Sequence, residues 1–441
     1  MLLGLGIAPV LAAPLAYITN SGDRNVSVID TATHAVIATV PVVDPFSLCC
    51  LGPVAVHPAG TRVYVTYWGS RGGTVAVIDT TTHTITDRVS LGGVHSFPGP
   101  GVAVNPAGTR IYATVSNPES FDRVTVIDTA TNTPIGSVSV RGGLGGVAVN
   151  PTGTRAYVAN GGSSTVSVVH IVADILFVLA TVPVGRTPQG IAVHPGGIFL
   201  YVTNSGDNSV SVIDTTTHTT VATVGVGVSP SGVAVHPAGT RVYIANSGSN
   251  TVSVVHTATH TVVATVPVGT GPSGLAVHPA GTRAYVTNSG SNSVSVIDTT
   301  SNTVSDTVTV GSRPLAFGQF IGPELAGVSL TLNQATFRRG ETLTLGATTY
   351  AGDTPHPVDA YVAVQLPDGT LFFLQGDGSL TTAIQPIVRN WTVSSFTDML
   401  FRYTFGGGEP SGNYRWLAAF TEPGTLNILG LIAQAAFTFS P

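Results

Sequence analysis

The stretch "PSGVAVHPAGTRVYIANSGSNTVSVVHTATHTVVATVPVG", residues 230–269, contains four short runs in which apolar and polar residues alternate. These runs are "GVAVHP", "RVYIAN", "TVSVVHT" and "VVATVPV", and the turn-forming segments "AG", "SGSN" and "TATH" separate them. Alternation over so few residues predicts β-strands, because successive side chains of a strand point to opposite faces. Four strands in a unit of this length are typical of one β-propeller blade.

The same unit recurs along the chain. Related tetrapeptides such as "YITN", "YVAN" and "YVTN" begin at seven tyrosines, Tyr17, Tyr64, Tyr112, Tyr157, Tyr201, Tyr243 and Tyr285. The first unit lacks a "GVAV" strand, and "RPLAFGQFIG" after the last unit is suited to replace it. We therefore predict an all-β, seven-bladed propeller in which a C-terminal strand, Leu315–Ile321, completes the blade that begins at Tyr17. Closure of this kind leaves no open sheet edge at the seam.

The tetrapeptides resemble the YVTN family of β-propeller repeats, which is also seen in archaeal surface-layer proteins and bacterial periplasmic proteins. The resemblance covers roughly residues 16–321 and implies a secreted or surface-located propeller. One periplasmic relative is linked to single-stranded DNA, and similar seven-bladed rings serve as lactonases and lyases. Function must therefore be inferred from a site and not from the ring.

The composition excludes several classes of function. Only 9% of residues are charged, all 17 basic residues are arginine, and the formal net charge is -5. Binding of nucleic acid is disfavoured, since it depends on clustered basic residues. The absence of lysine also excludes a Schiff base and a P-loop cation. We expect no cofactor.

Three regions divide the chain. Residues 1–15 form the larger part of an apolar run, "MLLGLGIAPVLAAPLA", that we interpret as a signal-peptide remnant. It is shorter than the roughly 20 residues of a membrane span, so we expect a secreted, periplasmic or cell-surface protein without a span in its mature form. The propeller occupies residues 16–321. Residues 325–441 contain strand-like runs such as "AYVAVQL" and "YRWLAAF" and resemble the immunoglobulin-like β-sandwich modules of secreted bacterial proteins.

Most polar residues belong to the repeat, and we expect them to be structural. Histidines recur in "HP" and in "TH", while arginine opens the second strand and aspartate ends the third. These two strands are antiparallel neighbours, which predicts cross-strand pairs such as Arg62–Asp79 and Arg283–Asp298.

The segments that depart from the repeat are residues 44–52, 67–73, 92–101 and 117–123. Each is either a blade-to-blade connection or a loop between the second and third strands, so all four should lie on one face over blades 1–3. Insertions gathered on one face of a repeat ring mark a binding surface. The residues that we predict to bind a ligand there are Phe46, Cys49, Cys50, Trp68, Arg71, Phe97 and Phe121.

The adjacent pair Cys49–Cys50 leaves several alternatives open. In an oxidising compartment the two thiols can form a strained vicinal disulfide. They can also be two buried reduced thiols, or take part in intermolecular or metal-linked contacts. The spacing does not complete a metal site, and we predict none.

The leading hypothesis is an exported binding or surface protein that recognises an uncharged ligand, such as a glycan, an aromatic compound or a partner protein. One alternative is a lyase or lactonase-like hydrolase in which Glu119 or Asp122 is the base and His95 the acid. Another is a subunit of an extracellular layer or filament. The apolar hairpin Ile171–Phe177 is expected to contact either the C-terminal domain or another subunit, which would give a homo-oligomer.

Overall fold

The computed structural model describes residues 14–42, 49–70, 72–92, 96–117, 121–140, 142–172, 175–323, 327–350, 357–375, 377, 379–392, 396–406, 408–421 and 428–440. These residues form strands and turns, and no helix among them is long and apolar enough to cross a membrane. The chain folds as two compact units, one of them Pro14–Gly322 and the other including the chain from Pro323 onward.

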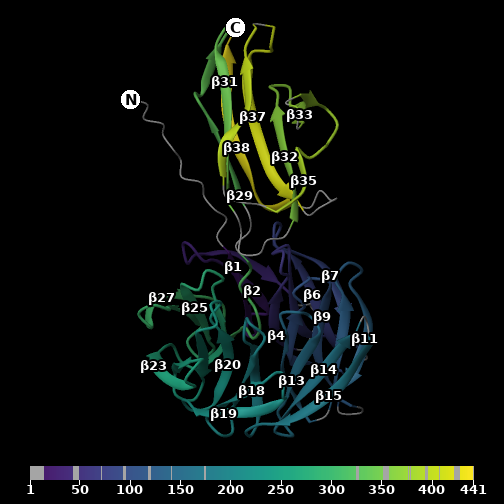
Figure 1. The fold of residues 1–441 in the computed structure, drawn as a ribbon, viewed down its shortest axis with the longest axis vertical. Coiled ribbons are helices and arrows are strands. Elements are labelled where there is room, and N and C mark those ends of the chain that lie inside the picture. Colours follow the sequence, from purple (N-terminus) through teal and green to yellow (C-terminus); the bar gives the residue numbers. More distant parts are fainter. Residues whose placement is uncertain are drawn as a thin grey trace. The chain divides into compact units, whose positions relative to one another are not determined.

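The first unit is a seven-bladed propeller, as predicted. Its seven four-stranded antiparallel sheets surround a common centre (Figure 1). The strands, from the innermost to the outermost of each blade, are β28 (Pro314–Leu315), β1 (Leu15–Asn20), β2 (Asn25–Asp30) and β3 (Val36–Pro41) in blade 1; β4 (Cys49–Val56), β5 (Arg62–Gly69), β6 (Gly72–Asp79) and β7 (Thr84–Ser90) in blade 2; β8 (Phe97–Val104), β9 (Arg110–Ser116), β10 (Arg123–Asp128) and β11 (Thr133–Ser139) in blade 3; β12 (Leu144–Val149), β13 (Arg155–Asn160), β14 (Thr165–Val172) and β15 (Ile175–Pro183) in blade 4; β16 (Pro188–Val193), β17 (Phe199–Asn204), β18 (Ser209–Asp214) and β19 (Thr219–Gly225) in blade 5; β20 (Pro230–Val235), β21 (Arg241–Asn246), β22 (Thr251–His256) and β23 (Thr261–Pro267) in blade 6; and β24 (Pro272–Val277), β25 (Arg283–Asn288), β26 (Ser293–Asp298) and β27 (Thr303–Thr309) in blade 7.

The core lies between the blades. Every repeat tyrosine is fully buried, and each packs into an apolar cluster that includes residues of a neighbouring blade. Tyr64 of blade 2, for example, lies in one cluster with Ile111 and Ile127 of blade 3. The alternation of the two middle strands therefore buries both of their faces, which is how face-to-face sheets form a core.

The ring is closed by the segment Pro314–Ile321, as predicted, but this segment is not one continuous strand. Leu315 pairs with Thr19, and Ile321 forms an isolated bridge with Ala16. Between these points the chain turns toward blade 2, where the Phe317 carbonyl accepts a hydrogen bond from the Val54 N–H at 3.1 Å. The predicted uninterrupted strand is wrong in this detail, because the closing segment bonds to two blades and not to one.

Side chains of the repeat connect neighbouring blades through backbone carbonyls. The "HP" histidines hydrogen-bond across the blade boundary: Nε2 of His57 lies 2.9 Å from the Gly108 carbonyl oxygen, and Nε2 of His194 lies 3.0 Å from that of Gly239. Arg62 lies opposite Asp79 in the register, but its Nη1 donates to the Thr129 carbonyl at 2.7 Å. The structural role of these residues is confirmed, although the expected Arg62–Asp79 pairing is replaced by a bond to the next blade.

Stability of the propeller is expected to fall between pH 6.5 and pH 5. Burial lowers the pKa of His83, and burial together with the nearby Arg155 guanidinium lowers that of His218. Since Nε2 of His218 lies 3.3 Å from Arg155 Nη1, which can only donate, this nitrogen acts as an acceptor and must be unprotonated. The unfolded chain takes up protons that the folded chain resists, so stability is lost as pH falls through the ordinary histidine pKa. The melting temperature, measured by circular dichroism, should be lower at pH 5 than at pH 7.5.

A double variant, His83→Asn with His218→Asn, provides the control. Both histidines adopt a positive φ, and asparagine takes the corresponding turn position at Asn132 and Asn302, again with a positive φ. The variant should therefore fold and should lose much of the decrease between pH 6.5 and pH 5. An undiminished decrease would assign the effect to other groups. A separate decrease below about pH 4 should persist, because Asp128, Asp214 and Asp298 accept backbone N–H bonds that lower their pKa values.

The C-terminal unit is a β-sandwich. One sheet has the order β29 (Gly327–Leu332), β31 (Thr342–Tyr350), β36 (Phe396–Thr404), and the other has the order β30 (Thr336–Arg338), β38 (Ile428–Ser440), β37 (Gly412–Thr421), β32 (Pro357–Gln365), β33 (Leu371–Leu374), β34 (Leu380–Thr381), with β35 (Val388–Thr392) also paired to β32. Both sheets contribute to one core, where Leu343 and Leu345 pack with Trp416 and Phe439.

Candidate functional site

Three of the segments that depart from the repeat lie together on one face of the propeller. The Gly73 N–H at the β5–β6 hairpin donates to the Ser96 carbonyl at 2.6 Å. From the start of β10, Arg123 Nη2 donates to the Leu91 carbonyl at 2.7 Å, and Asn117 Nδ2 lies 3.4 Å from the Ser96 hydroxyl. We call this side, which carries the blade-to-blade connections and the turns between second and third strands, the connector face.

The structure brings two of the predicted binding residues into contact. Trp68 and Phe97 are half-buried, and their rings meet edge to face with centroids 4.6 Å apart. Trp68 also pairs with Cys49 in the β4–β5 register. Phe121 is 61% exposed. Phe46, Arg71, His95 and Glu119 lie outside the described residues, as do the side chains of Cys49 and Cys50.

Asp122, the remaining candidate acid or base, occupies a structural position of the repeat. Its Oδ2 accepts the Gly143 N–H at 2.9 Å, and its Oδ1 lies 3.3 Å from the Asn117 nitrogen. Asn208 accepts the Ser229 N–H at the connection between blades 5 and 6, and Asn250 accepts the Gly271 N–H at the connection between blades 6 and 7, each through its side-chain oxygen. Asp122 therefore holds the connection between blades 3 and 4.

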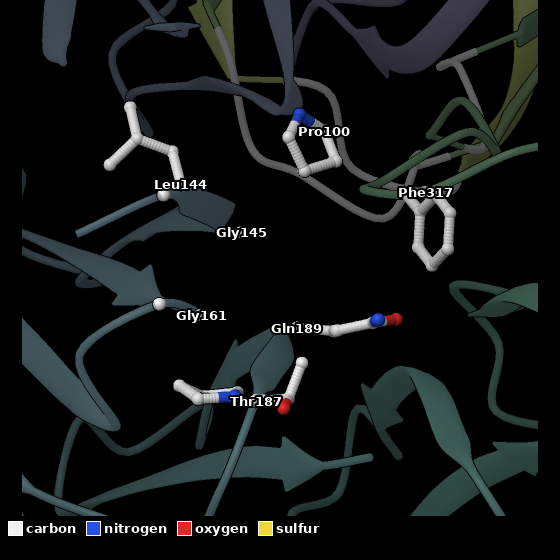
Figure 2. Close-up of a pocket in the computed structure, with 10 residues that line it drawn as sticks. Pro100, Leu144, Gly145, Gly161, Thr187, Gln189 and Phe317 are labelled. Atoms are coloured by element: carbon white, nitrogen blue, oxygen red, sulfur yellow. The ribbon is translucent and has the colours of Figure 1, made fainter. Parts of the chain in front are cut away.

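A cavity of about 340 Å³ opens at the centre of the propeller, and the sequence analysis did not identify it. Figure 2 shows the Gln189 amide and the Phe317 ring extending toward the same space. The residues around the cavity come mainly from blades 4 and 5: Pro100, Gly143, Leu144, Gly145, Gly161, Gly162, Thr187, Pro188, Gln189 and Phe317.

Blade 4 lacks two side chains beside the cavity that other blades carry, although a Cβ at Gly145 would lie 2.7 Å from the Gln189 carbonyl oxygen of blade 5. Gly145 stands where blades 6 and 7 have Ser231 and Ser273, and Gly161 stands where they have Ser247 and Ser289. Subtracting the repeat at these positions would have revealed the site from the sequence. The sequence predictions rest on insertions into the repeat, whereas a glycine in place of a serine is the loss of a side chain.

The Phe317 ring is supported by a fixed backbone. Its carbonyl is bonded to Val54, and the Gln319 carbonyl accepts the Val56 N–H at 2.9 Å. Gly318 has φ +95°, and a Cβ there would lie 2.8 Å from the Val54 carbonyl oxygen. The closing segment thus positions the Phe317 ring at the cavity.

The electrostatics of the cavity are simple. None of its ten lining residues is titratable, and Thr187 and Gln189 supply the polar side chains. Within the described part of the chain, no group of three or more His, Cys, Asp or Glu residues is placed to hold a metal ion. Such a lining is suited to binding an uncharged molecule.

Residues 101–319 match the family model of the choice-of-anchor I domain. The choice-of-anchor I match runs from β8 to the closing segment, so it includes every cavity residue except Pro100. No curated protein matches the chain.

Solved structures show the same fold at low identity. Hydrazine synthase from Kuenenia stuttgartiensis is 22% identical with a TM-score of 0.54, covering 68% of this chain and 99% of that chain. The periplasmic gluconolactonase of Pseudomonas aeruginosa is 17% identical, with a TM-score of 0.56 and coverage of 69% and 98%. A putative 6-phosphogluconolactonase from Bacteroides fragilis is 13% identical, with a TM-score of 0.56 and coverage of 70% and 98%.

Proposed function

We propose that this protein is an exported binding protein that holds a small uncharged ligand at the centre of its connector face. The observation that carries the proposal is the cavity of about 340 Å³ with no titratable side chain in its lining. Its volume falls within the range of about 300–1,000 Å³ typical of small-molecule sites. Trp68, Phe97 and Phe121, with Phe46, Cys49, Cys50 and Arg71, would extend the contact over blades 1–3.

Export is supported by the sequence and by the family match. The apolar N-terminal run has the character of a signal-peptide core. The matched domain is named for a choice of anchor, which suits a protein of the periplasm or the cell surface.

The variant Gly161→Ser tests the proposal, because it restores the serine of the other blades and narrows the cavity. Its Cβ would lie 3.2 Å from the Pro188 carbonyl oxygen, and the matching Ser289 donates to Gly271 at 2.9 Å. Ligands from a library of neutral ring compounds are expected to raise the melting temperature of the wild-type protein. Gly161→Ser should weaken ligand affinity at least tenfold and so reduce this shift in melting temperature. Trp68→Ala should reduce the shift less.

Ser289→Ala, at the same position of blade 7, is the matched control and should bind as the wild type does. Failure of every neutral ring compound to shift the melting temperature would refute the proposal. So would unchanged binding by a folded Gly161→Ser protein.

A lyase or lactonase-like hydrolase is the second candidate, because one protein of the same fold is described as a gluconolactonase and another as a putative 6-phosphogluconolactonase. In this chain the chemistry would depend on His95 and Glu119, since backbone N–H groups occupy both oxygens of Asp122. Hydrolysis of glucono-δ-lactone above its spontaneous rate, lost in His95→Ala, would favour this candidate.

Two further assignments are also proposals. The β14–β15 hairpin would contact a partner or a second subunit, as in a layer or filament, because Ile175 is 69% and Phe177 46% exposed. The C-terminal sandwich would be immunoglobulin-like. In support, the Tyr414 hydroxyl near the start of β37 donates to the Pro410 carbonyl at 2.5 Å, which matches the tyrosine corner of such domains.

A further inference from the structure

We propose that the ligand of the central cavity is a neutral pyranose sugar residue, with one ring face against Phe317 and a hydroxylated edge against Gln189 and Thr187. The inference rests on the proposed function and narrows its ligand to one chemical class. It depends on three features of the cavity: an aromatic platform, unengaged polar side chains and a wall of glycines.

The aromatic platform is Phe317. Its ring is half-buried and lines the cavity, while hydrogen bonds from blade 2 to the Phe317 and Gln319 carbonyls hold the backbone at and after the ring. A pyranose presents a patch of C–H groups on its ring face, and the electron-rich face of an aromatic ring suits such a patch. A ring held this way needs little ordering when the ligand arrives.

The polar groups are Gln189 and Thr187. In the described part of the chain neither the Gln189 amide nor the Thr187 hydroxyl has a hydrogen-bond partner, and both side chains are exposed at the cavity. The residues at the position of Gln189 in blades 6 and 7 differ in this respect. Ser231 donates to the Ser273 carbonyl at 3.0 Å, and the Ser273 and Thr287 hydroxyls lie 2.9 Å apart.

Blade 5 thus replaces a short serine, which is hydrogen-bonded within the ring, with a long amide that extends into the cavity (Figure 2). An amide presents both a donor and an acceptor, which matches two neighbouring hydroxyl groups of a sugar.

The glycines of blade 4 let a hydroxylated ligand approach the backbone. Gly143 and Gly161 line the cavity without side chains, as does Gly145, where a Cβ would also lie 2.7 Å from the Gln189 carbonyl oxygen of blade 5. In blade 5 the Thr203 hydroxyl accepts the Gly190 N–H at 2.8 Å. In blade 4 the residue at the position of Thr203 is Ala159, which has no hydroxyl. Close backbone approach is the usual reason for glycine at a binding site.

The same features disfavour other ligands. A charged ligand would meet no opposite charge in the lining, so its desolvation would be uncompensated. A wholly apolar ligand would bury the Gln189 and Thr187 polar groups without partners, which is costly. A ring with an apolar face and a polar edge avoids both penalties.

The test measures binding of methyl α-glucopyranoside, methyl α-mannopyranoside and methyl β-galactopyranoside to the full chain by calorimetry and saturation-transfer NMR. Cyclohexanol and phenol serve as rings without the hydroxylated edge, and glucuronate as a charged analogue. At least one methyl pyranoside should bind at least tenfold more tightly than all three comparators. Gln189→Ser and Phe317→Leu should each weaken its binding at least tenfold, while Gln434→Ser, a change of an exposed glutamine in β38, should not.

The outcomes separate this inference from the function on which it rests. If cyclohexanol or phenol binds as tightly as the sugars, or if a folded Gln189→Ser protein binds the sugar unchanged, the sugar assignment is overturned and the neutral-ligand cavity survives. If glucuronate binds most tightly, or if no neutral ring binds, both fail. Gln189→Ser introduces the residue of blades 6 and 7, so its melting temperature should match the wild type.

Discussion

Replacing Phe320 with alanine is expected to lower the free energy of unfolding of the propeller by about 3–5 kcal/mol, the usual cost of deleting a buried phenyl ring. Phe320 has no exposed surface, and it packs in the cluster that joins blade 1 to its neighbours. Its carbonyl also accepts the Tyr17 N–H at 2.9 Å. The midpoint of urea unfolding, followed by fluorescence, measures the loss.

Phe177→Ala is the control for this experiment. Phe177 lies on the outer strand of blade 4 and is 46% exposed, so its loss should cost about 1 kcal/mol or less. Equal effects of the two variants would show that the closing segment contributes no more than a surface strand.

Gly318→Ala is expected to destabilise the propeller by at least about 2 kcal/mol, because two penalties combine at this residue. Its φ of +95° is strained for any residue with a Cβ, and that Cβ would lie 2.8 Å from the Val54 carbonyl oxygen and 3.1 Å from that of Val102. Backbone atoms of two blades cannot move aside independently. The urea midpoint again provides the measurement.

Gly153→Ala separates the strain from the steric overlap. Gly153 has φ +71° in a turn of the same propeller, and the nearest atom to its added Cβ would be Pro106 Cδ at 3.8 Å. It should cost about 1 kcal/mol. A loss at Gly318 no larger than at Gly153 would mean that the closing segment can shift away from blades 2 and 3.

The sequence predicts the ring and its closure because each blade repeats the same alternation. Every "YVTN"-type strand buries its tyrosine. The expected Arg–Asp pair forms between Arg110 and Asp128 at 2.5 Å, whereas Arg283 lies opposite Asp298 in the register but donates to the Thr31 carbonyl at 3.0 Å. The closing strand was predicted at the right place. Its departure toward Val54 could not be foreseen, since it depends on how Gly318 fits between carbonyls of blades 2 and 3.

The candidate site was harder to predict than the fold. Insertions and aromatic residues predict a site over blades 1–3, where the rings of Trp68 and Phe97 are in contact. The cavity lies over blades 3–5, where Gly145 and Gly161 carry no side chain and Phe317 adds one from a distant part of the chain. Composition and spacing report what a segment gains; the loss of a serine becomes visible only when blades are aligned.

The bonds between blades have a consequence for the evolution of this chain. His57 and Arg62 reach across to carbonyl oxygens, of Gly108 and Thr129, and not to a complementary side chain. The glycine is needed there, because a Cβ at Gly108 would lie 2.5 Å from His57 Nε2, and the same histidine–glycine contact recurs at His194 with Gly239 and at His236 with Gly281. Since each repeat carries both halves of this contact, duplicated or recombined repeats can be joined in the gene without redesigning their boundaries, provided that the histidine and the glycine are kept.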